Sequence, residues 1–369
     1  MRLNKLAIAD FRNIASAGIK PGAHFNLLYG MNAQGKTNLL EAIYLLGSPR
    51  SFRHARLQEL VRHGAQTAQV QGDVQSGGIC SRVRLTLETV GRRVEIDGKG
   101  IQRASDLHGR LNAVVFSPDD TGMVKQGPDT RRRYLDRAVY MGDINYLHCW
   151  HGYHRILKQR NHLLKSADKS GLDIWTNQLA EAGAEVIERR QLYVSLLDTR
   201  LRHHYATISG NGESVGIGYF PEGVLATDRD SIRAELMELF QRHNCSDERY
   251  GTTSAGPHRD DLTFCLDGRP LKSFGSQGQQ KSFVLALKMA EMENLERIFG
   301  EPPLLLLDDM SSELDADRNR NLMAFFSCRE IQVFITTTER TPALKGAAGQ
   351  CAIFRVENGN LTFEGNESL

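Results

Sequence analysis

Apolar residues in the first hundred positions predict strands arranged around one helix. In 68–74 and 79–87 they alternate with polar residues, which is the period of a strand with one buried face. The turn signal Asp97-Gly98 follows shortly afterwards and predicts a hairpin, so this stretch is expected to be antiparallel. A short apolar run at 25–29 predicts a buried strand that enters a glycine-bounded loop, and 39–46 has the pattern of a helix.

Helical patterns replace strand patterns from about residue 119 to 244, most clearly in 153–165 and 175–201. Strands and helices then alternate, which is typical of a parallel α/β sheet. We therefore predict an α/β lobe formed by 1–118 with 245–369, interrupted by an inserted helical lobe at 119–244. The elements expected after the insertion are a strand at 263–266, a helix at 279–298, a strand at 304–308, a helix at 316–326 and a strand at 332–336.

Composition and charge exclude several classes of protein. The chain has 369 residues, 40% hydrophobic and 24% charged, which is ordinary for a globular protein and argues against disorder or a fibrous structure. The formal net charge of +2 excludes a strongly basic protein that coats nucleic acid. Charge is uneven along the chain, however, because 129–165 contains eight Lys or Arg and four His but three Asp. A basic surface therefore remains compatible with the sequence.

The sequence favours a cytoplasmic protein. The early positive charges are not followed by the apolar stretch of a secretory signal, and no apolar run approaches the roughly 20 residues that span a bilayer. The six cysteines form no C-x-x-C pair, so neither a zinc site nor a redox motif is indicated.

A segment between the strand at 25–29 and the following helix has the spacing G-x-x-x-x-G-K-T. Glycines at these positions let backbone N–H groups surround phosphates at the positive end of a helix. We expect Lys36 to reach the β- and γ-phosphates of ATP and the Thr37 hydroxyl to bind Mg²⁺. A glycine-rich turn before an unrelated helix is the alternative. The candidate nucleotide-binding residues here are Gly30, Met31, Asn32, Ala33, Gln34, Gly35, Lys36, Thr37 and Asn38.

A run of four leucines ends in Asp308 and Asp309, as expected for the second half of such a site. Asp308 is predicted to hold Mg²⁺, directly or through water. Asp309 is predicted to position or deprotonate the attacking water. The alternative is a plain buried strand that ends in two solvated acids.

The stretch before this strand resembles the signature motif of ABC-type ATPases. Ser276, Gly278 and Gln279 open a helix, where backbone N–H groups favour an anion, although a simple N-cap serine would look the same. In that class the signature of one subunit contacts the γ-phosphate held by the other. The residues that resemble the D-loop are Ser312, Glu313 and Asp315. Thr337 lies at the end of the next strand, where these ATPases commonly have a histidine that senses the γ-phosphate. This chain has no histidine there, and Thr337 is the expected catalytic substitute.

The chain has one P-loop and one signature, so each composite site needs two copies of the chain. We therefore predict that ATP brings two copies together in a two-fold dimer.

Together these motifs resemble those of the RecF family of bacterial recombination mediators, over essentially the whole chain. The stretches that carry the resemblance are 118–136, 256–262, 309–322 and the opening Asp10-Phe11-Arg12-Asn13. Gln126 departs from the pattern, since the family usually has glycine there. In this family and in SMC-type ATPases, the arginine that matches Arg12 commonly reaches the nucleotide.

The resemblance implies an ABC-type ATPase head with a mixed sheet, an antiparallel β subdomain and a helical second lobe, without a long coiled coil. It also implies ATP and Mg²⁺ binding, an ATP-dependent homodimer, slow DNA-stimulated hydrolysis and partnership with RecR. The expected role is recombinational gap repair at single-strand gaps or junctions, where recombinase is loaded. Support of replication restart and of the SOS response follows from that role.

Candidate DNA contacts come from the basic segment, and two interpretations stay open. Its arginines can bind phosphates, or they can pair with Asp129 and Asp136 in a structural cluster, which we favour for the 131–133 run. The candidates are Arg131, Arg132, Lys158 and Arg160. An SMC-like structural ATPase and an ABC-type motor or transporter subunit are the alternative functions. The absence of a long heptad stretch and of an apolar membrane segment speaks against them.

Overall fold

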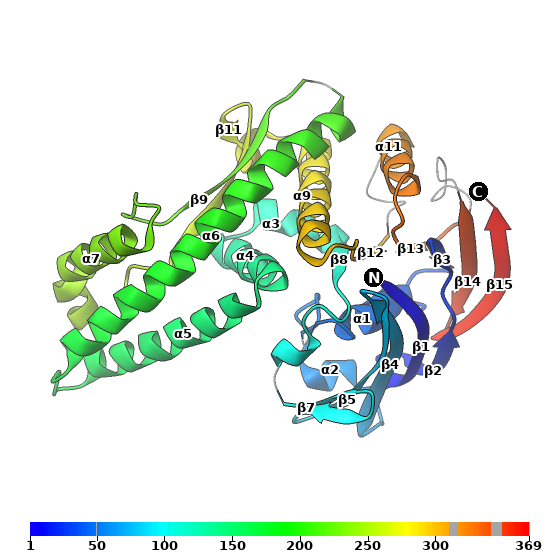
Figure 1. The fold of residues 1–369 in the computed structure, drawn as a ribbon, viewed down its shortest axis with the longest axis horizontal. Helices are drawn as coiled ribbons and strands as arrows, with labels where there is room; N and C mark the ends of the chain where they lie inside the picture. The colour runs from blue at the N-terminus through cyan, green and yellow to red at the C-terminus, as the bar shows by residue number, and fades with distance from the viewer. Residues whose placement is uncertain (49, 103, 211, 310–315, 341–348, 369) are drawn as a thin grey trace. The chain divides into compact units, whose positions relative to one another are not determined.

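The computed structural model describes residues 1–369 except 49, 103, 211, 310–315, 341–348 and 369 (Figure 1). The chain divides into two compact units. Unit 1 comprises Met1–Thr121, Thr207–Gly210 and Val284–Leu369, and unit 2 comprises Gly122–Ala206 and Asn211–Phe283.

A six-stranded, mainly parallel sheet forms the centre of unit 1 within the described residues. Its strands are rich in Leu, Val, Ile and Phe, and all four leucines of β12 are buried, as expected for parallel strands covered on both faces. Among its described strands, β15 at one edge pairs antiparallel with its neighbour and the others run parallel. In spatial order the strands are β15 (Asn360–Ser368), β14 (Gln350–Glu357), β3 (Phe25–Tyr29), β13 (Val333–Thr337), β12 (Leu304–Leu307) and β8 (Ala113–Phe116).

An antiparallel sheet is the second layer of unit 1, and the described residues give it six strands. Buried and exposed positions alternate along β5, so one face packs inward and the other faces solvent. In spatial order its strands are β2 (Ile14–Ile19), β1 (Arg2–Phe11), β4 (Thr67–Ser76), β5 (Ile79–Glu88), β6 (Arg92–Ile96) and β7 (Lys99–Ile101).

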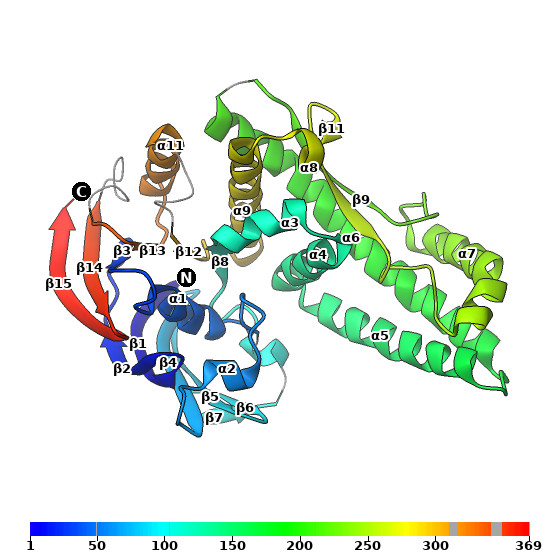
Figure 2. The ribbon, with the colours of Figure 1, turned by 180° about the vertical axis from the view of Figure 1, so that it is seen from behind.

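Helix α1 (Lys36–Leu45) packs against strands of both sheets of unit 1, namely β13, β1 and β4 (Figure 2). Leu39, Leu40 and Ile43 are fully buried in the core that the two layers share. A helix that is covered on both sides exposes little surface to solvent, which explains why the residues of this helix are almost uniformly apolar. The other described helices and turns of unit 1 are α2 (Leu57–Leu60), η1 (Ala104–Leu107), η2 (Pro118–Thr121), α11 (Ala316–Ser327) and most of α9 (Gln277–Phe299).

Unit 2 is mainly helical. Its long helices begin and end at local signals: Asp143 caps α5 by accepting a hydrogen bond from the Asn145 N–H, and Gly251 ends α7 in a left-handed conformation. Its helices are α3 (Gly122–Lys125), α4 (Pro128–Gly142), α5 (Ile144–Lys165), α6 (Leu172–Ser209), α7 (Arg229–Tyr250), α8 (Leu271–Phe274) and the first residues of α9.

Unit 2 also contains a small sheet, of which the sequence predicted only the strand at 263–266. Strand β10 (Asp261–Leu266) lies between β9 (Val215–Phe220) and β11 (Arg269–Pro270), and all pairings are antiparallel. The predicted boundary differs here, because 245–283 groups with unit 2 rather than with the ATP-binding lobe. The β9–β10 pairing and a buried Arg160–Asp247 ion pair join this segment to the helices. No helix in the described part of the chain is both long and apolar enough to cross a membrane.

Candidate nucleotide-binding site

The loop between β3 and α1 has the backbone that the glycine-rich motif predicts. Gly30, Ala33 and Gly35 have positive φ angles of 157°, 65° and 110°. A Cβ on Gly30 would lie 2.2 Å from the Val356 carbonyl oxygen, so a side chain there would require the backbone to move. The loop is therefore built to bring backbone N–H groups close to a ligand at the start of α1.

Lys36 lies at the first position of α1, and its ammonium group bends back over this loop. Nζ donates to the carbonyl oxygens of Gly30 at 2.6 Å and Met31 at 2.9 Å. Burial lowers the pKa of Lys36, while the nearby carboxylates of Asp309 and Asp308 oppose that shift. A cation among carbonyl and carboxylate oxygens is well placed to bind phosphate.

Thr37 and Asp308 come together although 271 positions separate them. The Thr37 hydroxyl is 2.8 and 2.9 Å from the two carboxylate oxygens of Asp308. Neighbouring strands produce this contact, because the P-loop follows β3, Asp308 follows β12, and β13 lies between them. The carboxyl ends of parallel strands meet at one sheet edge, which is where such folds bind ligands.

Asp308 is buried and held by a second hydroxyl, which donates from Thr336 at 2.7 Å. Burial raises the pKa of the Asp308 carboxyl, and the hydrogen bonds from Thr336 and Thr37 counteract it. A hydroxyl oxygen and a carboxylate are hard oxygen donors of the kind that Mg²⁺ binds together with substrate phosphates. The residues present therefore fit Mg²⁺.

Asp309 follows directly, with a positive φ of 48°. Its backbone N–H donates to the Thr336 hydroxyl at 2.9 Å. One threonine thus contacts both consecutive acids and fixes the turn that follows β12. Thr337, the residue predicted as the substitute for a histidine, is buried and its hydroxyl accepts from the Glu339 N–H at 3.3 Å. The hydroxyl that contacts the Asp308 carboxylate in addition to that of Thr37 belongs to Thr336, which was not among the predicted site residues.

Arg12 is placed beside the P-loop helix by a buried acid. Its guanidinium donates to both carboxylate oxygens of Glu41, at 2.8 and 2.9 Å, and Glu41 is fully buried within α1. Ser51 also donates to Glu41, so the acid joins α1, the residue after β1 and the segment at Ser51. Glu41 carried no motif signal in the sequence. Its position in a run of apolar residues on α1 is the feature that could have marked it.

Further amides connect the same loop. Asn13 donates to the Gln34 carbonyl at 3.1 Å and accepts from Asn38 at 2.8 Å. The Gln34 side chain accepts from the Asn358 N–H at 2.6 Å, while Met31 and Asn32 are exposed at the tip. The D-loop candidates Ser312, Glu313 and Asp315 lie outside the described residues.

The signature candidates belong to unit 2, at the start of α9. The exposed Ser276 accepts a hydrogen bond from the Gln279 N–H at 3.2 Å, and the Gln279 side chain accepts from the Ser276 N–H at 2.7 Å. This reciprocal capping leaves Gly278 in the first turn of the helix. The geometry is that of a capped helix N-terminus, as the simpler interpretation predicted.

Arg131 and Arg132, the first two DNA candidates, are occupied by contacts within unit 2. Arg131 forms two 2.7 Å hydrogen bonds with the carboxylate of Asp261. Arg132 pairs with Asp129 and donates to the Asp260 carbonyl at 2.6 Å. These contacts favour the structural interpretation of the arginine run.

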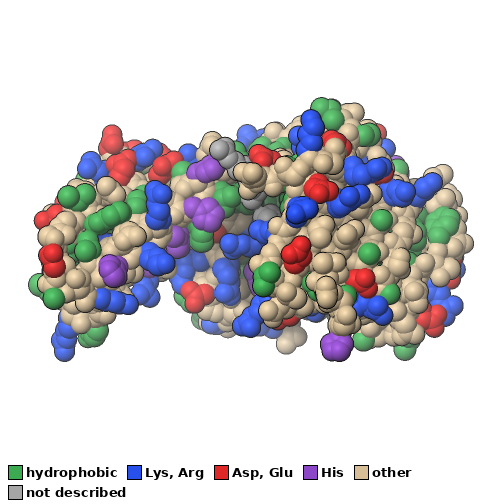
Figure 3. All heavy atoms as spheres, turned by 90° about the horizontal axis from the view of Figure 1, so that it is seen from below, with side chains coloured by type: hydrophobic (Ala, Val, Ile, Leu, Met, Phe, Trp, Pro, Cys, Tyr) green, Lys and Arg blue, Asp and Glu red, His purple; other side chains and the backbone are tan. Residues whose placement is uncertain are grey.

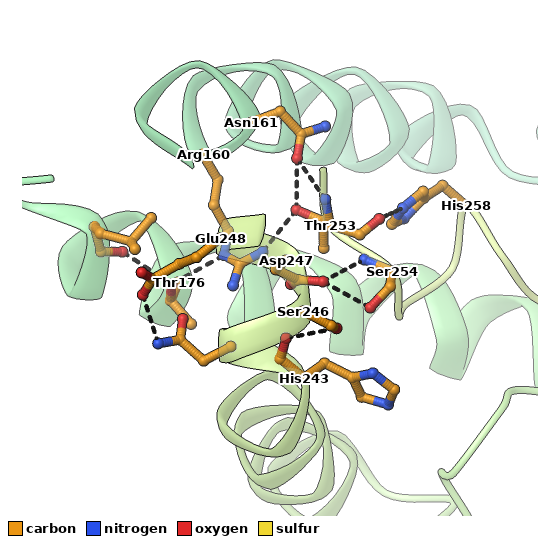
Figure 4. Close-up of polar contacts among 12 residues, drawn as sticks. Arg160, Asn161, Thr176, His243, Ser246, Asp247, Glu248, Thr253, Ser254 and His258 are labelled. Carbon is orange, nitrogen blue, oxygen red and sulfur yellow. Dashed lines mark hydrogen bonds and ion pairs between the residues drawn. The ribbon is translucent and has the colours of Figure 1, made fainter. Parts of the chain in front are cut away.

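Arg160 is fully buried, and this contradicts the prediction that it contacts DNA. Figure 4 shows its guanidinium directed at Asp247, with 2.8 Å between Nη1 and Oδ2. Nη1 also donates to the Thr253 hydroxyl at 2.7 Å, and Nε donates to Thr176 at 3.0 Å. The helical register turns this side chain inward, whereas Lys158 on the same helix is exposed.

Comparisons with known proteins agree with these motifs. The family model described as RecF/RecN/SMC N terminal domain matches residues 2–362. "DNA replication and repair protein RecF" of Trichlorobacter lovleyi (strain ATCC BAA-1151 / DSM 17278 / SZ) is 51% identical over 366 residues, which cover 99% of each chain. The protein of the same name from Geobacter sulfurreducens (strain ATCC 51573 / DSM 12127 / PCA) is 47% identical and covers 98% of this chain and 100% of its own.

Solved structures show the same relationship. "Structure of the recombination mediator protein RecF-ATPrS in RecFOR pathway" matches with a TM-score of 0.90 and 31% identity, over 99% of this chain and 98% of the other. An Smc head domain from Pyrococcus furiosus, bound to the C-terminal domain of ScpA, matches with a TM-score of 0.57 and 15% identity, over 99% and 96% of the two chains. The second likeness confirms the predicted fold of an SMC-like ATPase head. The family model and the near-full-length relatives show that the chain belongs to the RecF family.

Proposed function

We propose that this chain is an ATP-dependent DNA-binding protein of recombinational gap repair. ATP with Mg²⁺ binds at the P-loop of unit 1 and brings two copies together, and the dimer holds DNA at single-strand gaps. Recombinase loading, with RecR as partner, is the task that this state serves. Replication restart and SOS induction depend on the same task.

The contact between the Thr37 hydroxyl and the Asp308 carboxylate is the observation that carries the nucleotide site. A glycine-rich turn that occurs by chance would not be expected to place a hydroxyl against a carboxylate at the end of a strand 271 positions away. Lys36 adds a buried cation directly beside this pair of oxygen ligands. The arrangement of cation, hydroxyl and carboxylate is the one that binds nucleotide phosphates with a divalent metal.

Each residue of the site has a distinct task. The backbone N–H groups of the loop and the Lys36 ammonium bind the phosphates, and Lys36 leaves the Gly30 carbonyl to do so. Thr37 and Asp308 hold Mg²⁺, which neutralises negative charge on the phosphate oxygens when it is bound. Asp309 accepts the proton of the attacking water, and Thr336 holds it in position through its backbone. Arg12, oriented by Glu41, adds positive charge beside the loop.

The repair role is supported by the names of the relatives. Two near-full-length relatives are called DNA replication and repair protein RecF. A solved structure 31% identical to this chain is described as "Structure of the recombination mediator protein RecF-ATP in RecFOR pathway". These names favour a mediator of repair over a transporter or motor subunit.

The dimer follows from the signature. Ser276 caps α9 with its side chain exposed, so the helix N-terminus is accessible to a phosphate from another molecule. One chain supplies the P-loop and its partner supplies Ser276, which makes ATP the bridge between copies.

Light scattering with and without ATP and Mg²⁺ tests the proposal with two variants. Lys36→Met is expected to lose ATP binding and dimerisation together. Ser276→Arg is expected to keep ATP binding by the monomer and to lose only the dimer, because the bulky cation fills the position of the γ-phosphate contact. A Ser276→Arg chain that still dimerises with ATP would disprove the contact in trans, and a Lys36→Met chain with normal ATP affinity would disprove the site.

A further inference from the structure

Helix α5 contains no Asp or Glu in its 22 residues. Basic side chains occupy six of its eight exposed positions, at successive spacings of three or four residues, which places them on one face of a helix. At about 1.5 Å per residue, this line of side chains is about 26 Å long. We call it the α5 basic stripe, and its residues are His148, His151, Arg155, Lys158, His162 and Lys165.

The other face of α5 is buried in unit 2, so the stripe is held rigidly. Tyr146, Tyr153 and Leu164 pack inward, and Arg160 is tied to Asp247. The orientation of the stripe is therefore determined by the core of the unit. Figure 3 views the molecule from the side on which α5 lies in Figure 1, and blue and purple side chains are spread over the part formed by unit 2.

The permanent charges of the stripe are not neutralised within the described part of the chain. Arg155, Lys158 and Lys165 form no ion pair there, in contrast to the buried Arg160. The carboxylates of the neighbouring elements are already paired with other cations, as Asp143 and Glu185 are with Arg189. The three charges therefore remain available to a ligand.

A hollow of about 430 Å³ runs along the C-terminal half of the stripe. Its lining consists of His154, Leu157, Lys158, Asn161, His162 and Lys165. Apart from Leu157, these are polar or basic side chains that can donate hydrogen bonds, which suits the oxygen atoms of a phosphodiester chain.

We propose that the α5 basic stripe binds the phosphodiester backbone of nucleic acid. This proposal rests on the DNA binding in the proposed function and names the surface for it. The line of about 26 Å matches seven or eight nucleotide steps of a duplex, at about 3.4 Å per step on each strand. The stripe replaces Arg131, Arg132 and Arg160 as the DNA contact, because those side chains serve the structure of unit 2.

Two other kinds of partner fit the stripe less well. Protein interfaces are anchored by buried aromatic or aliphatic side chains, and helices on membranes insert an apolar face. Among the described residues, α5 exposes no large apolar side chain to solvent. A phosphate backbone needs only the positive charge and the hydrogen-bond donors that the stripe supplies.

The test uses the full chain with the substitutions Arg155→Gln, Lys158→Gln and Lys165→Gln combined. Fluorescence anisotropy measures its affinity for a gapped DNA in ATP and Mg²⁺ over a range of KCl concentrations. Each phosphate contact contributes about 0.9 to the slope of log K against log salt for duplex DNA, so we expect the slope to fall by two to three. At low salt we expect at least a tenfold loss of affinity.

A matched control removes the same charge elsewhere, through Lys20→Gln, Arg93→Gln and Lys99→Gln, all exposed in unit 1. We expect this control to keep nearly the normal slope, and both variants to keep normal thermal stability and ATP binding, since every substituted side chain is exposed. Restoring charge with Lys158→Arg in the stripe variant is expected to recover about one third of the slope.

Distinct outcomes separate the stripe from the proposed function. If the stripe variant keeps the normal salt slope, the α5 basic stripe is not the DNA-binding surface, although DNA binding itself stands. The same conclusion follows if the control variant loses as much slope as the stripe variant. A stripe variant with normal DNA binding but lost binding to vesicles of anionic lipid also overturns it. An unmodified chain that binds no DNA at any salt concentration with ATP overturns the proposed function itself.

Discussion

Replacing Arg160 with methionine tests whether this arginine holds unit 2 together. The side chain is fully buried, pairs with Asp247 at 2.8 Å and lies over the Phe240 ring at 5.3 Å from its centroid. Methionine retains much of the apolar length but leaves the Asp247 carboxylate buried without its cation. Breaking a buried ion pair in this way costs about 3–5 kcal/mol of unfolding free energy.

That cost predicts a large fall in the melting temperature of unit 2. For a unit of this size, about 1 kcal/mol corresponds to about 2–4 °C, so we expect a fall of roughly 6–20 °C. Differential scanning calorimetry of the full chain measures it. Hydrogen exchange should localise the loss to amides around Thr253 and Ser254, which share hydrogen bonds with Arg160 and Asp247 (Figure 4).

A second variant separates loss of the pair from loss of one charge. Arg160→Met combined with Asp247→Leu removes both charges, and we expect it to be more stable than Arg160→Met alone. The salt dependence of DNA binding should remain normal in both variants at temperatures where they are folded. If Arg160→Met melts within about 2 °C of the unmodified chain and reduces the salt slope by about one, the structural explanation is refuted and Arg160 contacts DNA.

Three further predictions concern other residues. Asp309→Asn should bind ATP and dimerise but hydrolyse ATP about 10²–10⁴-fold more slowly, because a general base is lost; hydrolysis at the normal rate would rule out that role. Glu41→Gln should weaken ATP binding by about tenfold in calorimetric titration, because Arg12 loses its charged partner; unchanged affinity in a folded variant would show that Arg12 acts without it. Burial lowers the pKa of His258 to about 4, although the hydrogen bond from its ring to the Thr253 carbonyl opposes that shift. As the pH falls, His258 therefore binds a proton in the unfolded chain before it does in the folded one. The free energy of unfolding should fall by up to about 3 kcal/mol between about pH 6.5 and pH 4. His258→Asn should remove most of this pH dependence, which thermal unfolding at several pH values measures.

Much of the nucleotide site could be predicted because its chemistry is local. The residues 30–37 form one contiguous turn, and the ligand-binding geometry follows from glycines and a helix start within eight positions. Asp308 could be predicted because an apolar strand that ends in an acid has few other uses beside a P-loop. Glu41 and Thr336 could not, because their partners are Arg12 and Asp308, and only the packing of α1 and the order of the strands brings them close.

The boundary of unit 2 escaped prediction for a similar reason. Strand β10 agrees with the strand predicted at 263–266, but its partner β9 lies more than 40 residues earlier. A strand pattern shows that a segment is extended and does not show which strand pairs with it. The assignment of 245–283 to a unit therefore depended on tertiary contacts.

The basic segment shows most clearly what each level determines. The sequence alone determines that 129–165 is rich in positive charge and that its arginines and lysines lie on helices. Only the tertiary structure decides which of them are available, since helix packing turns Arg160 toward the core and leaves Lys158 two residues away in solvent. The physical reason is that a buried cation needs a carboxylate beside it, and Asp247, contributed by α7, is brought to that position only when the unit folds.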